Sequence, residues 1–144
     1  MDQYNCTNLP HFSLSGNTYR ARLLDVHDGD TITVGAEVFP GRAFQLIVRL
    51  LGINAPEMSD KQKGEEARTR LVSILIPSIV LDSKRHLTRK EMRDILQKQI
   101  NIIQVKCQGM DKYGRVLAEV YAENSSEHAG DILLREGLAK SYLG

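Results

Sequence analysis

The chain has 144 residues, of which 42% are hydrophobic and 26% are charged. This length suits one domain with a buried core and is too short for two ordinary domains, and the composition is that of a globular protein. The longest apolar run, residues 71–81, contains two serines and a proline and is too short to cross a membrane. The first residues lack the basic and apolar regions of a signal peptide, so we expect an intracellular protein. We also expect a monomer without membrane contact.

The net charge of +1 is unevenly distributed along the chain. Residues 82–115 carry a net charge of +5, whereas residues 1–81 carry −1 and residues 116–144 carry −3. A basic middle segment is compatible with a polyanionic partner such as nucleic acid. A solvated helix face explains it as well, because four of the cations fall in one helical segment: Arg89, Lys90, Arg93 and Lys98. Charge alone leaves both interpretations open.

The only cysteines, Cys6 and Cys107, are too far apart in sequence to form a metal-binding motif or a disulfide framework. We expect two free thiols in a reducing compartment.

Residues 1–18 are polar and aperiodic, and they predict a flexible leader. Alternating apolar residues then predict strands over 21–26, 31–34 and 44–51, with a turn at Asp28-Gly29-Asp30 and a stop at Gly52. Because the connections are short, these three strands are expected to form an antiparallel meander.

Helical signals follow the third strand. Ser59 and Gln62 are placed as a capping box for a helix that must stop before Pro77. Thr88 and Glu91 form a second capping box, and it opens a helix whose expected buried stripe is Met92, Ile95, Leu96, Gln99 and Ile100.

Strands return at 102–107 and 116–121, and a last helix over 129–136 ends at Gly137, which suits a left-handed cap. The sequence therefore predicts an α+β, mainly β fold: a five-stranded OB-fold barrel with about three helices. We place this domain at residues 19–144 and expect an inserted helical segment at about 77–100.

Four separated pieces of sequence carry the chemistry: residues 27–31, Arg49, residues 54–57 and residues 111–115. Cleaving a phosphodiester requires a carboxylate-held cation, positive groups on the phosphoryl oxygens, and a group that positions water. Asp30 and Glu57 offer the carboxylates, and Arg49 and Arg115 offer guanidiniums that can donate two parallel hydrogen bonds to phosphate.

Each piece also has a plain structural interpretation. Asp-Gly-Asp is a common turn, Asn-Ala-Pro a common loop, and Arg49 among apolar neighbours could simply pair with a buried acid. His27, which has no spaced partner, is more consistent with a structural role than with a ligand. The occurrence of all four pieces in one chain favours a site.

These residues resemble the staphylococcal nuclease (thermonuclease) family. The matching stretches are 28–31, 48–57, 111–115 and 134–140, within residues 20–76 and 101–142. The resemblance implies an OB-fold barrel that hydrolyses DNA and RNA with Ca²⁺.

The resemblance also assigns roles to individual positions. Asp30 would bind the cation directly, together with Asn54 and the backbone carbonyl of Ala55, and Glu57 would orient or deprotonate the attacking water. Arg49 and Arg115 would hold the phosphate. The nucleotide pocket would be lined by Lys112 and Tyr113.

Two features depart from the family pattern. Asn54 stands where the family has an aspartate, and the lost charge predicts a weaker cation site that needs more Ca²⁺ or prefers Mg²⁺ or Mn²⁺. The segment at 77–100 has no counterpart, and residues 84–100 could contact nucleic acid, bind a protein partner, or pack on the barrel.

We therefore expect a divalent-metal-dependent nuclease, a hydrolase acting on single-stranded DNA or RNA. The alternative is a catalytically weak or inactive OB-fold module that binds single-stranded nucleic acid or a protein partner.

Overall fold

The computed structural model describes residues 1–79, 81 and 87–142. Its elements, in chain order, are β1 (Thr18–Val26), β2 (Thr31–Phe39), β3 (Arg42–Leu50), β4 (Ile53–Asn54), α1 (Lys61–Leu75), α2 (Arg89–Gln97), β5 (Ile102–Met110), β6 (Val116–Ala122), α3 (Ala129–Arg135) and β7 (Lys140–Ser141). Five strands form a closed barrel in the order β1-β2-β3-β6-β5. The predicted α+β barrel of the OB type, with three helices, is confirmed.

The barrel is closed by one parallel pairing. Neighbouring strands pair antiparallel except β3 and β6, which run parallel with Arg49 opposite Leu117. Side chains alternate along each strand, so one residue in two points inward. The inward set includes Leu23, Ile32, Val48 and Ile103, all with no exposed surface.

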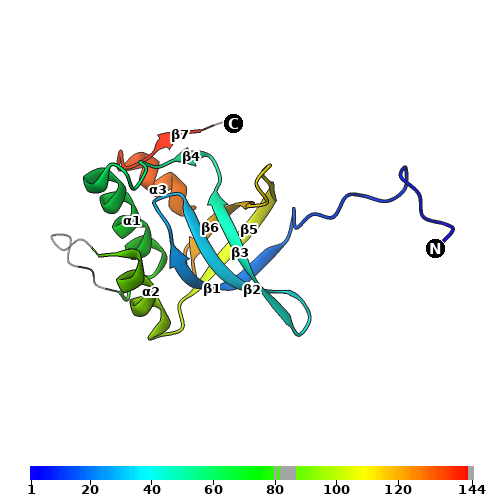
Figure 1. Ribbon diagram of the computed structural model, residues 1–144, viewed down its shortest axis with the longest axis horizontal. Coiled ribbons are helices and arrows are strands. Elements are labelled where there is room, and N and C mark those ends of the chain that lie inside the picture. Colours follow the sequence, from blue (N-terminus) through cyan, green and yellow to red (C-terminus); the bar gives the residue numbers. More distant parts are fainter. Residues whose placement is uncertain (80, 82–86, 143–144) are drawn as a thin grey trace.

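The helices cover one side of the barrel. Figure 1 shows α1 and α2 on the side opposite to the one from which the N-terminal segment leaves. Helix α1 buries Ala67, Leu71 and Leu75 at helical spacing. Helix α2 buries Met92 and Leu96.

Two sequence predictions about the helices are wrong. The N-cap of α1 is Asp60, whose side chain accepts from the Lys63 N–H, whereas the Ser59 hydroxyl donates to Glu57 instead. Gln99 and Ile100, both predicted to be buried, are exposed, Ile100 by 76%, because α2 ends at Gln97 and its periodicity no longer applies.

Three predictions at element ends and thiols are confirmed. The Thr88–Glu91 capping box is formed in full. Gly137 has a φ of 74° directly after the end of α3, in the left-handed region. Cys6 is an exposed and Cys107 a buried free thiol.

The N-terminal segment joins the barrel before β1 begins. Leu14 belongs to the core, the Gly16 N–H donates to the Cys107 carbonyl, and the Cys107 N–H donates to Asn17. The preceding residues run away from the barrel (Figure 1). None of the helices formed by the described residues is long and apolar enough to span a membrane.

The segment predicted as an insertion, 77–100, contains α2; its residues 80 and 82–86 lie outside the described residues. Arg89 attaches α2 to β1, since its Nε and Nη2 donate to Asp25 Oδ2 at 2.9 and 2.7 Å. Asp25 is buried, and its other oxygen accepts no hydrogen bond from the described residues. Arg89 therefore supplies the charge that balances this buried carboxylate, which accounts for one of the cations in the basic segment.

We predict that Arg89→Ala lowers the free energy of unfolding by about 1–3 kcal/mol, because it leaves Asp25 buried without its partner. This range is below that of a fully buried pair because the Arg89 side chain is 48% exposed. Urea unfolding would measure the change, with the exposed neighbour Lys90→Ala as the matched control. Equal midpoints for the two variants would contradict this role of Arg89.

Candidate active site

The β1–β2 turn carries two carboxylates into the same small space. The Asp30 N–H donates to Asp28 Oδ1 at 3.0 Å, and the His27 N–H donates to the Thr31 carbonyl at 2.9 Å, which closes the turn. Asp30 is buried, whereas Asp28 is partly exposed. His27 bonds the Thr33 hydroxyl, in keeping with the structural role expected for it.

The Asp30 carboxylate connects three segments of the chain. Oδ1 accepts from the Thr31 hydroxyl at 2.8 Å, and Oδ2 accepts from the Ala55 N–H at 2.8 Å. Oδ2 also forms an ion pair with Arg49 Nη1 at 2.8 Å. The turn, strand β3 and the loop after β4 therefore meet at one side chain, as they must if Asp30, Arg49 and Ala55 act together.

The two carboxylates of the turn have opposite pKa shifts. Burial, followed by the neighbouring Asp30, raises the pKa of Asp28 to about 6. Burial also acts to raise the pKa of Asp30, but hydrogen bonds from Asp28, Ala55 and Thr31 and the charge of Arg49 outweigh it, and the pKa lies below its ordinary value. Asp30 is thus held as the anion, the form that binds a cation or an arginine.

Arg49 lies between the turn and the chain end. Its Nη2 donates to Asn54 Oδ1 at 3.3 Å, and its guanidinium carbon lies 5.5 Å from the centre of the Tyr142 ring. Tyr142 is placed by the short sheet of β4 and β7, after which its N–H donates to the Gly52 carbonyl. Sequence reasoning missed Tyr142, although it lies only two residues after the matching stretch 134–140.

Arg115 directly precedes β6, the strand whose Leu117 lies opposite Arg49 on β3. Arg115 Nε donates to Asp111 Oδ2 at 2.6 Å, and Asp111 Oδ1 accepts from the Tyr113 and Arg115 N–H groups. Asp111, a residue given no role from sequence, therefore orients the whole turn.

The substrate-pocket residues predicted at this turn lie together. The Lys112 amino group is 5.2 Å and the Arg115 guanidinium carbon 5.5 Å from the centre of the Tyr113 ring. The Tyr113 ring is largely exposed. An exposed ring with two cations suits contact with a base and its phosphates.

Glu57 stands apart from the cluster around Asp30. It is exposed, its carboxylate accepts from the Ser59 hydroxyl at 3.4 Å, and its carbonyl accepts from the Asp60 N–H at 3.0 Å. A side chain added at Gly64 would lie 2.6 Å from the Glu57 carbonyl oxygen, so the glycine lets α1 pack closely on this loop. The structure thus brings together Asp30, Arg49, Asn54 and Ala55, with Glu57 and Arg115 outside that cluster.

The oxygen atoms offered by Asp30, Asn54 and Ala55 are of the kinds that hard cations prefer as ligands. Carboxylate, amide and backbone carbonyl oxygens bind Ca²⁺ and Mg²⁺, and Asp30, Asn54 and Ala55 offer one of each. Asp28, whose pKa is raised to about 6 by burial and by Asp30, holds its proton more readily than an ordinary aspartate and so adds less negative charge to the turn. Among the described residues, no group of three or more His, Cys, Asp and Glu side chains could hold a metal, so any such site depends on neutral oxygens.

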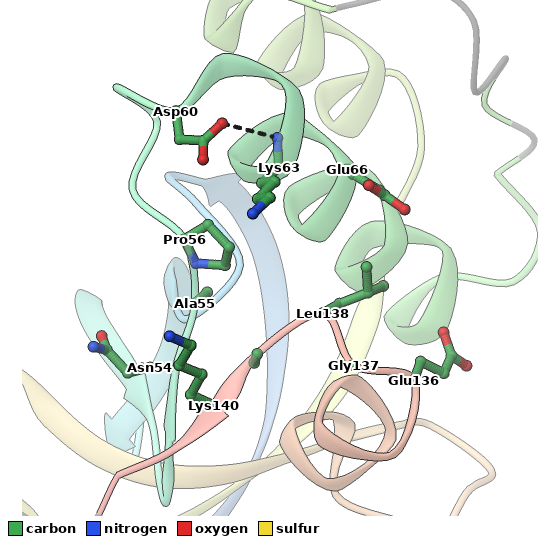
Figure 2. Close-up of a pocket in the computed structure, with 11 residues that line it drawn as sticks. Asn54, Ala55, Pro56, Asp60, Lys63, Glu66, Glu136, Gly137, Leu138 and Lys140 are labelled. Atoms are coloured by element: carbon green, nitrogen blue, oxygen red, sulfur yellow. Dashed lines mark hydrogen bonds between the residues drawn. The ribbon is translucent and has the colours of Figure 1, made fainter.

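A cavity of about 590 Å³ lies beside the Asn54-Ala55-Pro56 loop. Figure 2 shows Lys63 from α1 and Lys140 from β7 pointing into it from opposite walls. Asp60, Glu66 and Glu136 also line it, so the charges of its walls are mixed. This cavity shares Asn54 and Ala55 with the candidate site.

The closed five-stranded barrel, with the β1–β2 turn held against Arg49 through Asp30, defines an OB-fold domain. The family model described as staphylococcal nuclease homologue matches residues 47–143, and the chain belongs to this family. The matched range includes Arg49, Asn54, Glu57 and Arg115, whereas Asp30 precedes it.

A protein of Methanocaldococcus jannaschii, the uncharacterized protein MJ1439, is 26% identical to the chain over 153 aligned residues. The match covers 99% of this chain and 68% of that protein. The similarity to this protein extends across the whole barrel, and the name of that protein indicates no chemical activity for it.

The packing of Gly29 generates a prediction about the turn. A Cβ at this position would lie 2.8 Å from the Cβ atoms of both Ala55 and Ala67, and neither can move without its backbone. We expect Gly29→Ala to displace the turn from the loop and α1, at a cost of about 1–3 kcal/mol in stability.

The control is Gly109→Ala, where an added Cβ meets nothing within 4 Å. Thermal unfolding of both variants would measure the difference. A Gly29→Ala melting temperature equal to that of the wild-type chain would show that the turn is not held by this contact.

Proposed function

We propose that the chain is a nuclease that hydrolyses phosphodiester bonds in single-stranded DNA or RNA with one divalent cation. The observation that carries this proposal is the buried Asp30 carboxylate, ionised and placed within 2.8 Å of both Arg49 Nη1 and the Ala55 N–H. Membership of the staphylococcal nuclease family supports the same reaction.

Asp30, Asn54 and the Ala55 carbonyl would hold the cation. When bound, it would neutralise the charge that develops on the phosphate and lower the pKa of water. Ca²⁺ is the choice that the family implies. Mg²⁺ and Mn²⁺ are the alternatives, since Asn54 removes a negative charge that a Ca²⁺ site ordinarily uses.

The remaining roles belong to side chains of the chain itself. Glu57 is exposed on the loop next to Asn54 and Ala55. Its carboxylate would accept a proton from the attacking water and orient that water toward the phosphorus atom. Arg49 on β3 and Arg115 just before β6 would donate to the phosphoryl oxygens, and Lys112 and Tyr113 would contact the neighbouring nucleotide. Arg49 already spans Asp30 and Asn54, so it would link phosphate to the cation ligands.

We predict that Arg115→Ala lowers the rate of single-strand cleavage by about 10²–10³, the scale of losing a preorganised charge stabiliser. The rate at saturating substrate and cation should be measured. The control is Arg20→Ala, which removes an exposed arginine of β1 that pairs with Glu123, just after β6. A loss of ten-fold or less in Arg115→Ala would argue against its role.

Asn54→Asp tests the proposed cation ligands. Restoring a carboxylate should lower the cation concentration for half-maximal activity, because affinity follows the charge of the ligands. Asn124→Asp, which adds the same charge at an exposed turn, is the control. An unchanged midpoint in Asn54→Asp would rule out Asn54 as a ligand.

One observation favours a second candidate, a binding module without catalysis. The Asp30 oxygens already accept from Thr31 and Ala55 and contact Arg49, so a cation must compete with donors of the chain. This alternative predicts salt-sensitive binding of single strands with no cleavage at any cation concentration.

A further inference from the structure

Exposed aromatic side chains gather at the end of the barrel from which the N-terminal segment departs. Phe39 is 45%, Phe44 42% and Tyr113 72% exposed, and Phe12 of the N-terminal segment is 72% exposed. Ile47 and Met110 add exposed apolar surface. Figure 1 shows the β2–β3 hairpin and the β5–β6 turn on this side of the barrel, opposite α1 and α2.

The hairpin carries an aromatic pair with its own cation. The Phe39 and Phe44 rings meet edge to face, with centroids 6.3 Å apart and planes at 86°. The Arg42 guanidinium carbon lies 5.7 Å from the centre of the Phe44 ring. The hairpin thus presents a ring and a guanidinium side by side, with almost half of each ring open to solvent.

The second aromatic group, at the β5–β6 turn, lies on the same hollow. One groove of about 430 Å³ is lined by Phe39, Phe44, Tyr113 and Arg115, together with Ile47 of β3. Among the described residues, the groove lining includes no carboxylate, and its charged member is Arg115. Arg115, which we propose to hold the phosphate, therefore also lines this groove.

We infer that this groove binds the bases of a single-stranded nucleic acid, with the strand continuing from Arg115 to the Phe39–Phe44 pair on the β2–β3 hairpin. The inference rests on the proposed function, which it deepens by extending the substrate from one nucleotide to several. Aromatic rings stack on any base, and arginines beside them neutralise the phosphates. Arg115 in the groove lining and Arg42 beside the Phe44 ring carry charge opposite to that of a nucleic-acid strand.

The geometry favours a strand over a duplex. Stacking on Phe44 and Tyr113 requires unpaired bases with free faces, which a duplex does not offer. The N-terminal segment adds the exposed Phe12 and the buried Leu14 to the groove lining, and Phe44 and Tyr113 remain 42% and 72% exposed beside them.

The test is binding of labelled 12-nucleotide DNA and RNA strands in EDTA, followed by fluorescence anisotropy. We expect the double variant Phe39→Leu with Phe44→Leu to bind roughly five- to hundred-fold more weakly, since stacking is lost while apolar surface is kept. Phe44→Trp should retain binding. Ile100→Ala, an exposed apolar residue beyond α2, is the control, and thermal unfolding checks that each variant is folded.

Arg42→Ala gives an independent readout. Removing one phosphate contact should lower the slope of log affinity against log salt by about 1, and this effect should be absent in Ile100→Ala. Equal slopes for Arg42→Ala and the wild-type chain would remove Arg42 from the strand path.

A second measurement separates the groove from the reaction. The rate of cleavage of a minimal diester that contains one nucleoside should be unchanged in the Phe39→Leu, Phe44→Leu variant. The rate of cleavage of the 12-nucleotide strand, measured at a low concentration of that strand, should fall. Absence of all cleavage with ring-dependent binding intact would overturn the proposed reaction and support the groove.

Three results would overturn the inference itself: unchanged strand affinity in the double variant, duplex binding as tight as single-strand binding, or a wild-type dimer that the double variant converts to monomer. The last result would assign the groove to a second copy of the chain.

Discussion

The candidate site depends on one carboxylate, that of Asp30. It is buried, and a buried carboxylate is stable only with hydrogen bonds and an opposite charge. Thr31 in its own turn, Ala55 in the loop after β4 and Arg49 on β3 supply these partners. Because the partners come from three segments, the need to balance one charge places the turn, the strand and the loop at a common point.

Two further contacts hold this arrangement from outside. The two-residue pairing of β4 with β7 joins the C-terminal strand to the loop. It also places the Tyr142 ring against the Arg49 guanidinium, which restricts the movement of that side chain. On the opposite side, α2 is attached through Arg89 and Asp25, at a distance from the aromatic groove. The barrel thus separates a helix-packed side, where the cations balance buried charge, from an open side, where they accompany exposed rings.

Patterns of periodicity predicted most of the fold, because the barrel strands and the capping box of Thr88 have strong local signals. Local signals also misled: Ser59 is as good a cap as Asp60 in sequence, and Ile100 keeps the helical period after the helix has ended. The pairing of β4 and β7 and the position of Tyr142 depend on segments far apart in the chain. Local sequence patterns therefore could not predict them. The roles of the site residues remain proposals that rest on resemblance and on their placement around Asp30.

The most direct test of the central claim is degradation of single-stranded DNA and RNA by the purified chain across titrations of Ca²⁺, Mg²⁺ and Mn²⁺, with Glu57→Ala as the paired variant. The account predicts cleavage that requires a cation and disappears in Glu57→Ala while strand binding persists. Strand binding without cleavage at any cation concentration, or equal cleavage by the variant, would contradict it.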